Sequence, residues 1–176
     1  IQGELELRRN ACKPGDIILT TGIHGLSKLG FLIQNKINFD NEFSLNERLI
    51  IKSIEHFCRP RVYPNFLNNL LKTRSNKNIR RIGCTDSSDG LFQALQDLAI
   101  ASNCKAIINY EKIPKDKDWP KGDKWDEYYF FGGEDYELVF SLPKKWAENL
   151  SKLDKNINEI GFFTDGEPSI EFKDYK

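Results

Sequence analysis

Residues 83–91, Gly-Cys-Thr-Asp-Ser-Ser-Asp-Gly-Leu, carry two carboxylates and two serine hydroxyls within four consecutive positions. Asp86 and Asp89 offer hard oxygen ligands of the kind that Mg²⁺ prefers in proteins. The stretch leads into a predicted helix, and the N–H groups and positive dipole end of a helix N-terminus attract phosphate. These groups together suit a metal–phosphate complex. Serine and aspartate are also common where a helix begins, because their side chains accept backbone hydrogen bonds. Taken alone, the stretch fits a simple helix cap better than a site.

A second stretch whose residues could take part in chemistry, residues 131–138, reads Phe-Gly-Gly-Glu-Asp-Tyr-Glu-Leu. Its two glycines allow the backbone to turn tightly and to approach a ligand closely. Glu134 and Asp135 come just before a predicted buried strand, where free carboxylates accept hydrogen bonds from a substrate or help to hold a metal. A solvated tight turn explains the same residues equally well when this stretch is considered alone.

Both stretches lie between elements that would hold them in place. Residues 78–82 predict a strand before the first stretch, and residues 91–103 predict a helix after it, because leucines recur there on one helical face. Residues 136–140 predict a buried strand that follows the second stretch. Each stretch is therefore expected to lie at the end of a regular element.

An earlier part of the chain has a similar junction. Residues 17–21 predict a buried strand, and residues 22–25, Gly-Ile-His-Gly, then break the chain. A helix is expected to follow, because apolar residues recur at helical spacing at Leu26, Leu29, Ile33 and Ile37. A glycine-flanked helix start can hold a phosphate, but glycine there often only makes the turn, and the turn is favoured here.

The remaining elements are predicted from the same kinds of pattern. Ser44 and Glu47 have capping-box spacing at the start of a helix that ends near residues 59–60. Trp119 lies in a predicted loop, residues 111–123, and is expected to fold back onto its own domain. Further helices are expected within residues 64–71, around Trp125, Tyr128 and Tyr129, and from Pro143, with strands at 105–110, 157–163 and 169–172. This alternation predicts an α/β (α+β) fold with a mixed sheet and helices packed on it.

The composition argues against several classes of partner. At 176 residues the chain has the length of one domain, which we expect to span residues 1–176. Its 26 lysines and arginines are balanced by 26 acidic residues, so no net charge draws it onto nucleic acid or an anionic membrane. No apolar run approaches the roughly 20 residues that cross a bilayer, and the chain does not begin with a signal-peptide pattern. We therefore expect a cytoplasmic protein without nucleic-acid or membrane partners.

The cysteines and histidines form no recognisable metal-binding or disulfide pattern. The four cysteines are widely spaced and include no C-x-x-C pair, which favours reduced thiols. His24 and His56 are too far apart in the sequence for metal-ligand spacing. We interpret both histidines as structural or surface residues.

Taken together, the two stretches resemble the C-terminal half of the thiamine-monophosphate kinase family, within the aminoimidazole-ribonucleotide-synthetase superfamily. The resemblance rests on Asp-x-Ser-Asp-Gly-Leu from Asp86 and on Gly-Gly-Glu-Asp-Tyr-Glu-Leu from Gly132, and it extends over nearly the whole chain. The Gly-Gly-Glu-Asp string is the most specific part, because the sister enzymes share the first motif but usually lack this one. Shorter segments resemble family features in the right order, namely residues 13–16, 21–22, 59–60 and 165–168.

This resemblance implies that the full-length protein transfers the γ-phosphoryl group of ATP to thiamine monophosphate, giving thiamine diphosphate, with several Mg²⁺ ions. Matched residue by residue, Asp86 and Asp89 would be Mg²⁺ ligands. Ser88 would contact the nucleotide phosphates, and Glu134 would contact the thiamine phosphate substrate. Phosphoryl transfer asks the protein mainly to position oxygens and neutralise charge, and the attacking group is the substrate's own ionised phosphate. No residue is therefore assigned as a catalytic base.

The chain also departs from the family pattern. Gly25-Leu26-Ser27 replaces the family's Gly-Asp-Ser, so no ligand role is assigned to that loop, and Ser87 stands where the family prefers an apolar residue. The sequence contains no methionine and begins as if within a longer chain. We expect a fragment without the family's N-terminal domain, which carries further metal-binding aspartates, much of the ATP site and a homodimer interface. The aromatic residue that the family presents to thiamine would follow Lys176, and the fragment alone is expected to be inactive.

Two alternatives remain open from the sequence. The first keeps the superfamily but changes the acceptor, to a synthetase of the aminoimidazole-ribonucleotide or selenophosphate type, and the string at residues 132–138 argues against it. The second is a non-catalytic assembly domain in which Asp86 and Asp89 only cap a helix.

Overall fold

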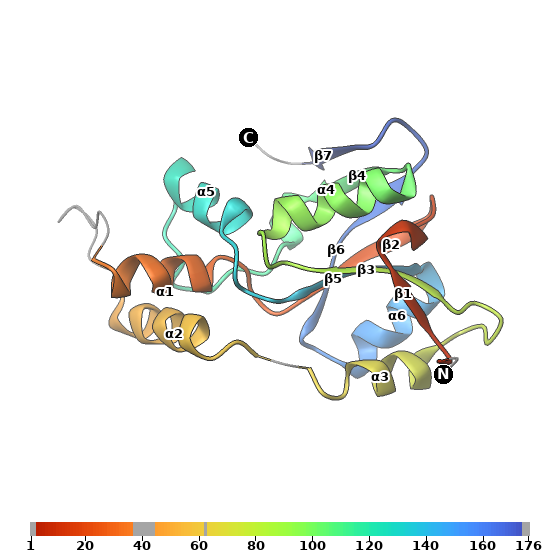
Figure 1. The fold of residues 1–176 in the computed structure, drawn as a ribbon, viewed down its shortest axis with the longest axis horizontal. Helices are drawn as coiled ribbons and strands as arrows, with labels where there is room; N and C mark the ends of the chain where they lie inside the picture. The colour runs from red at the N-terminus through yellow and green to blue at the C-terminus, as the bar shows by residue number, and fades with distance from the viewer. Residues whose placement is uncertain (1–2, 37–44, 62, 174–176) are drawn as a thin grey trace.

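The computed structural model describes residues 3–36, 45–61 and 63–173, and within them one mixed seven-stranded sheet forms the centre of the molecule (Figure 1). Its strand order is β1-β3-β5-β2-β6-β4-β7. The pairs β1/β3 and β4/β7 are parallel and the other pairs are antiparallel. The strands are β1 (Glu6–Arg8), β2 (Asp16–Thr21), β3 (Arg81–Asp86), β4 (Lys105–Asn109), β5 (Leu138–Pro143), β6 (Ile157–Thr164) and β7 (Ser169–Lys173). The predicted fold class is confirmed.

Helices cover both faces of this sheet. They are α1 (Leu26–Gln34), α2 (Glu47–Cys58), α3 (Phe66–Thr73), α4 (Leu91–Ser102), α5 (Asp123–Phe131) and α6 (Lys144–Leu153), with short 3₁₀ turns η1 (Arg9–Ala11) and η2 (Tyr110–Lys112). Ile18 and Val139 pack into a core with α1, α2, α4 and α5, whereas their neighbours Leu19 and Phe140 pack into a second core with α3 and α6. Successive side chains of a strand point to opposite faces, so each strand supplies both cores.

The strand ends that carry the predicted site lie together at one end of the central strands. β2 and β3 both run antiparallel to β5, so their C-terminal ends lie beside its N-terminal end. Asp86 is opposite Leu138, and Thr21 is opposite Ile157 at the start of β6. Segments far apart in the chain therefore meet at this end of the central strands (Figure 1).

Some element boundaries differ from those predicted. β3 begins at Arg81 and continues through Asp86, so Asp86 ends a strand rather than lying in the loop that follows it. β5 begins at Leu138, two residues later than predicted, because Glu134 and Tyr136 have φ angles of 68° and 53° that a strand does not allow. β1, three residues long, was not predicted; it is defined by its parallel pairing with β3 rather than by a pattern of its own.

Two other predictions concern the helix starts and the long loop. The N-cap of α2 is Asn46, whose side chain accepts a hydrogen bond from the Arg48 N–H; Ser44 of the predicted capping box and Ile37 of the first helical stripe lie outside the described residues. Trp119 is buried and its ring packs near Trp125 and Tyr129, so it folds back onto its own domain as predicted.

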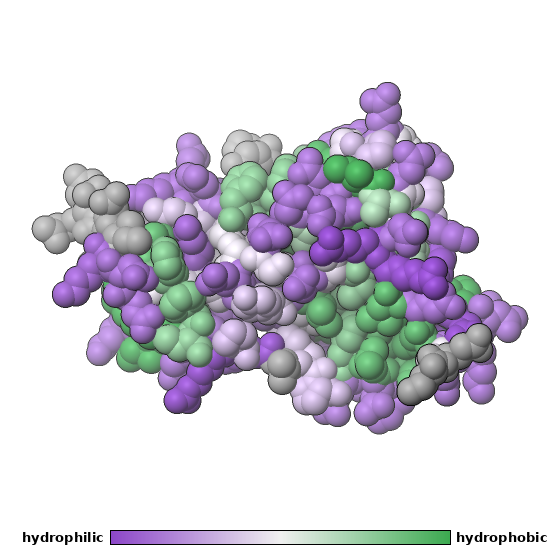
Figure 2. Space-filling view, in the orientation of Figure 1, coloured by the Kyte–Doolittle hydropathy of each residue, from purple (hydrophilic) through white to green (hydrophobic). Residues whose placement is uncertain are grey.

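The surface is mostly polar, with apolar side chains gathered over α3 and the adjoining strands (Figure 2). A cavity of about 720 Å³ opens beside this area, between the chain that enters α3 and the start of β5. Its lining is largely aromatic and aliphatic and includes Tyr63, Phe66, Leu67, Tyr136 and Leu138. Among the helices of the described residues, none is long and apolar enough to cross a membrane.

Candidate functional site

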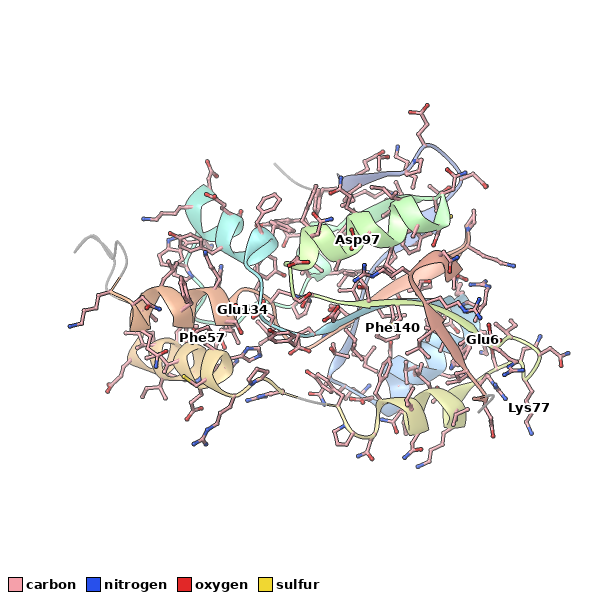
Figure 3. The ribbon with its side chains drawn as sticks, in the orientation of Figure 1. Glu6, Phe57, Lys77, Asp97, Glu134 and Phe140 are labelled. Atoms are coloured by element: carbon pink, nitrogen blue, oxygen red, sulfur yellow. The ribbon has the colours of Figure 1, made fainter. Side chains whose placement is uncertain are left out.

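The two stretches singled out by the sequence lie side by side and are joined by hydrogen bonds. The Glu134 N–H donates to the Ser88 carbonyl at 2.8 Å, and the Ser87 N–H donates to the Glu137 carbonyl at 2.8 Å. The buried Ser87 hydroxyl accepts a third bond from the Glu137 N–H at 3.1 Å. Ser87 thus has a structural role that the sequence did not indicate. These contacts place Glu134 beside the loop that begins α4 (Figure 3).

The predicted site residues are accessible and make no contacts that would occupy them. Asp86 and Ser88 are half-buried, and Asp89 and Glu134 are exposed. Within the described part of the chain, none of these four side chains makes a hydrogen bond or an ion pair. By contrast, Asp135 and Glu137 are 1% and 2% exposed and have several partners each. The chain therefore separates carboxylates that face outward from carboxylates that hold the structure together.

Asp86 and Asp89 do not cap α4. Gly90 is the N-cap residue, with a φ of 97° that favours glycine, and no described side chain accepts a hydrogen bond from the first turn of the helix. Asp86 and Asp89 thus lie just before the first turn of α4, whose N–H groups no described side chain caps. The helix-cap interpretation of the aspartates is not supported by this geometry.

The donor set suits a metal that is shared with a phosphate. In residues 3–36, 45–61 and 63–173, no group of three or more His, Cys, Asp or Glu side chains is placed to hold a metal ion. Mg²⁺ is often bound by only one or two carboxylates, with substrate phosphates and waters completing its six oxygens. Two unpaired aspartates at a helix N-terminus match this requirement.

The first glycine junction is closed by an internal carboxylate. Asp135 accepts hydrogen bonds from the N–H groups of Gly25 at 2.6 Å and Ser27 at 2.9 Å, at the start of α1. The positive end of α1 is thereby occupied by a side chain of the protein itself. Burial raises the pKa of Asp135 to about 6, against the opposing effect of these N–H donors. The turn interpretation of residues 22–25 is confirmed.

Glu137 holds the end of β2. Its Oε2 accepts a hydrogen bond from the Thr21 hydroxyl at 2.6 Å, and the Thr21 oxygen in turn accepts one from the Leu138 N–H at 2.8 Å. Burial acts to raise the pKa of Glu137, but the polar groups of His56, Thr21 and Tyr63 outweigh it and the pKa is lowered. Glu137 is therefore a buried carboxylate in the folded protein.

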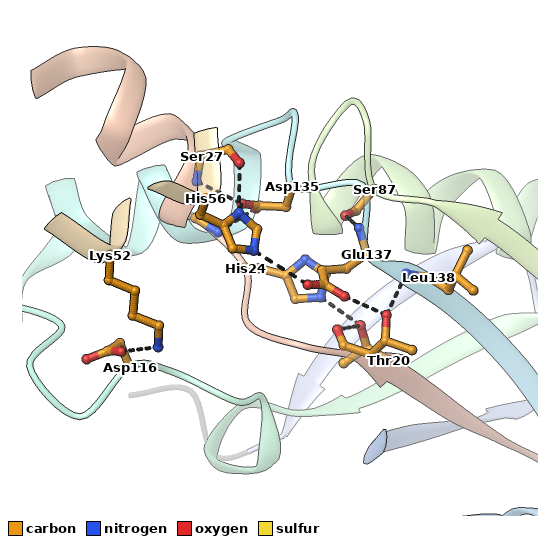
Figure 4. Close-up of polar contacts among 12 residues, drawn as sticks. Thr20, His24, Ser27, Lys52, His56, Ser87, Asp116, Asp135, Glu137 and Leu138 are labelled. Atoms are coloured by element: carbon orange, nitrogen blue, oxygen red, sulfur yellow. Dashed lines mark hydrogen bonds and ion pairs between the residues drawn. The ribbon is translucent and has the colours of Figure 1, made fainter. Parts of the chain in front are cut away.

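Both histidines belong to this buried network (Figure 4). His56 lies between the two buried carboxylates, with Nδ1 3.7 Å from Asp135 and Nε2 3.6 Å from Glu137. His24 is fully buried, its Nε2 lies 2.7 Å from the Thr20 hydroxyl, and its Nδ1 has no hydrogen-bond partner among the described residues. The structural interpretation of the histidines is confirmed. The sequence could not show that they share one network, because the contacts that join them link residues far apart in the chain.

His24 is expected to make the protein less stable in mild acid. Burial lowers its pKa from 6.5 to about 4, so its contribution to stability is fully present above pH 6.5 and is lost as the pH falls toward 4. The expected loss is about 2 kcal/mol between pH 7 and pH 5. Urea unfolding of the wild type and of His24→Gln at both pH values measures it, since the wild type should lose about 2 kcal/mol more than the variant between pH 7 and pH 5. The raised pKa of Asp135 acts in the opposite direction but in both proteins. Parallel pH curves would contradict the assignment to His24.

Comparison with known proteins gives both a family and relatives. The model of the family "AIR synthase related protein, C-terminal domain" matches residues 13–173. Thiamine-monophosphate kinase of Prochlorococcus marinus is 35% identical over 165 residues, which are 94% of this chain and 50% of that protein. The enzyme of the same name from Synechococcus elongatus is 31% identical over 84% of this chain and 43% of that protein. The chain thus spans about half the length of the curated relatives that it matches.

A solved structure is similar to this chain over the same extent. The structure described as AaThiL complexed with AMPPCP and TMP superposes with a TM-score of 0.72 at 26% identity, over 96% of this chain and 52% of that one. The similarity covers nearly the whole chain, so the fold of this domain is shared with that structure.

Proposed function

Because this chain belongs to the family of AIR synthase related proteins, as their C-terminal domain, we propose that its full-length protein transfers the γ-phosphoryl group of ATP to thiamine monophosphate. The products are ADP and thiamine diphosphate. The names of the relatives and the ligands named for the solved structure support this choice of substrates. The observation that carries it here is that the carboxylates of Asp86, Asp89 and Glu134 have no partner among the described residues, while the hydrogen bond from the Glu134 N–H to the Ser88 carbonyl joins the segments that carry them.

Each outward-facing residue has a role in this proposal. Asp86 and Asp89 would hold Mg²⁺, of which the full-length enzyme would use several ions, and the metal would supply positive charge beside the phosphoryl group. Ser88 contacts the nucleotide phosphates at the N-terminus of α4, where N–H groups favour anions. Glu134 contacts the thiamine phosphate substrate. The acceptor oxygen is already ionised at neutral pH, so these residues position and neutralise, and none needs to remove a proton.

A coupled assay of ADP release by the full-length protein tests the reaction. Mg-ATP is supplied with thiamine monophosphate, with no acceptor, or with the acceptors of the sister synthetases. ADP release that requires thiamine monophosphate supports the proposal. Release with any acceptor, or with none, would leave only the family-level resemblance.

We expect the 176-residue chain alone to have no measurable kinase activity. The described residues supply two unpaired aspartates but no group of three metal-binding side chains, and phosphoryl transfer with several metals needs more. The remaining ligands and a homodimer interface are proposed to come from the other half of the full-length protein. The same ADP assay with the isolated chain checks this, and robust turnover would refute it.

A further inference from the structure

We propose that His56 is a positioning residue that fixes the segment 134–137 and thereby aims Glu134 at the acceptor phosphate. The proposal rests on the proposed function, in which Glu134 contacts thiamine monophosphate. His56 itself does not reach the outward face, because it is 5% exposed and lies on α2 beneath the segment. It acts through the two buried carboxylates of the Gly-Gly-Glu-Asp-Tyr-Glu-Leu string.

The segment that His56 faces has an unusual backbone. Glu134 and Tyr136 have φ angles of 68° and 53°, in the left-handed region that side chains other than glycine seldom occupy. Both are exposed, whereas Asp135 and Glu137 are buried. Such a backbone persists only where the surrounding structure holds it, and it is often found at binding sites. Exposed and buried residues thus alternate along the segment, so Glu134 faces outward while Asp135 and Glu137 anchor the backbone.

Each anchor is tied to a different element. Asp135 is bound to the first turn of α1, and Glu137 is bound to Thr21 at the end of β2. These bonds place two carboxylates within one buried region, where a charge is costly unless an opposite charge lies beside it. A basic group beside the two carboxylates would therefore help the segment to keep its backbone.

His56 is placed to balance the charge of these carboxylates. In the described part of the chain, its imidazole is the one basic side chain within 4 Å of either carboxylate, and Ser27 fixes its Nδ1 at 3.0 Å. Its two ring nitrogens face one anchor each, so this one side chain links α2 to both buried carboxylates of the segment (Figure 4). Without it, the carboxylates lower their energy by moving toward water, and that movement shifts Glu134.

The kinetic test compares His56→Gln with His24→Gln in the full-length protein. The two histidines are both buried, but among the described residues no hydrogen bond or ion pair joins His24 to Asp135 or Glu137, and His24 interacts with Glu137 only through the longer-range charge of that carboxylate. We expect His56→Gln to raise KM for thiamine monophosphate about 10-fold while KM for ATP changes less than about 2-fold. His24→Gln should leave both KM values near those of the wild type. Equal effects of the two variants, or equal effects on both substrates, would overturn the positioning role.

A second variant tests the charge balance directly. Asp135→Asn removes one buried negative charge, and its single oxygen can still accept from one of the two α1 N–H groups that Asp135 binds, those of Gly25 and Ser27. Added to His56→Gln, it should bring KM for thiamine monophosphate back by at least about 3-fold, because a neutral glutamine then faces a single carboxylate. A double variant that is no better than His56→Gln alone would contradict the inference.

Amide hydrogen exchange tests the segment without relying on activity. The N–H groups of Glu134, Glu137 and Leu138 are hydrogen-bonded and should be protected in the wild type. Their exchange should be about 10-fold or more faster in His56→Gln and unchanged in His24→Gln. Unchanged exchange in His56→Gln would overturn the proposal. If the wild type shows no thiamine-monophosphate-dependent turnover, the function fails, and this measurement still decides whether His56 holds the segment.

Discussion

Replacing Asp89 with asparagine in the full-length protein is expected to lower kcat/KM for thiamine-monophosphate-dependent ADP release by about 100-fold or more. Asparagine keeps the size of the side chain and one oxygen, but it loses the negative charge that a magnesium ion requires. Asp89 is exposed and makes no bond to another described residue, so the substitution removes no structural contact. The apparent Mg²⁺ constant should rise together with the loss of rate. Asp86→Asn should behave in the same way.

The matched control for this experiment is Asp97→Asn. Asp97 lies two turns further along α4, where it accepts a hydrogen bond from Gln93 and pairs with Arg9, away from the predicted site (Figure 3). Its substitution changes the charge of the same helix without touching the proposed metal ligands. Activity within about 2-fold of the wild type is expected, because exposed pairs contribute little. Unchanged Mg²⁺ affinity in Asp89→Asn would favour the non-catalytic alternative instead.

Gly133→Ala is expected to weaken both the fold and the activity. A methyl group at residue 133 would lie 2.3 Å from the Ser88 carbonyl oxygen, which is a backbone atom and cannot rotate away. The segment that carries Glu134 would have to separate from the loop that carries Ser88. Forced packing of this kind costs about 2–3 kcal/mol of unfolding free energy. A shift of Glu134 by about 1 Å should lower kcat/KM by about 100-fold.

Gly3→Ala provides the control for that substitution. A methyl group there meets no atom closer than 3.5 Å, an ordinary contact distance. Its effect on unfolding in urea should stay within about 0.5 kcal/mol, as for most surface changes. If Gly133→Ala were as stable and active as Gly3→Ala, the close approach of the two stretches would not be needed for either property.

Local sequence patterns predicted many of the helices and strands. The leucines of residues 91–102 and the Ser-Asp-Gly turn before them define α4 within one residue, because the spacing of apolar side chains and the backbone needs of glycine are local properties. The motifs also identified the relatives correctly, since their similarity to thiamine-monophosphate kinases is confirmed. The metal and substrate roles of Asp86, Asp89, Ser88 and Glu134 stay predictions.

The sequence by itself thus determined most of the helices and strands, the family, and the two stretches that carry the acidic candidates. Only the tertiary structure decided that Asp135 and Glu137, two acids of the same string, are internal anchors and that His56 lies between them. Asp135 meets Gly25 across 110 residues of sequence, and Glu137 meets Thr21 across 116. No local pattern encodes such contacts, because they arise from the antiparallel pairing of β5 with both β2 and β3. Burial, which separates an anchor from a ligand, is fixed only when those strands come together.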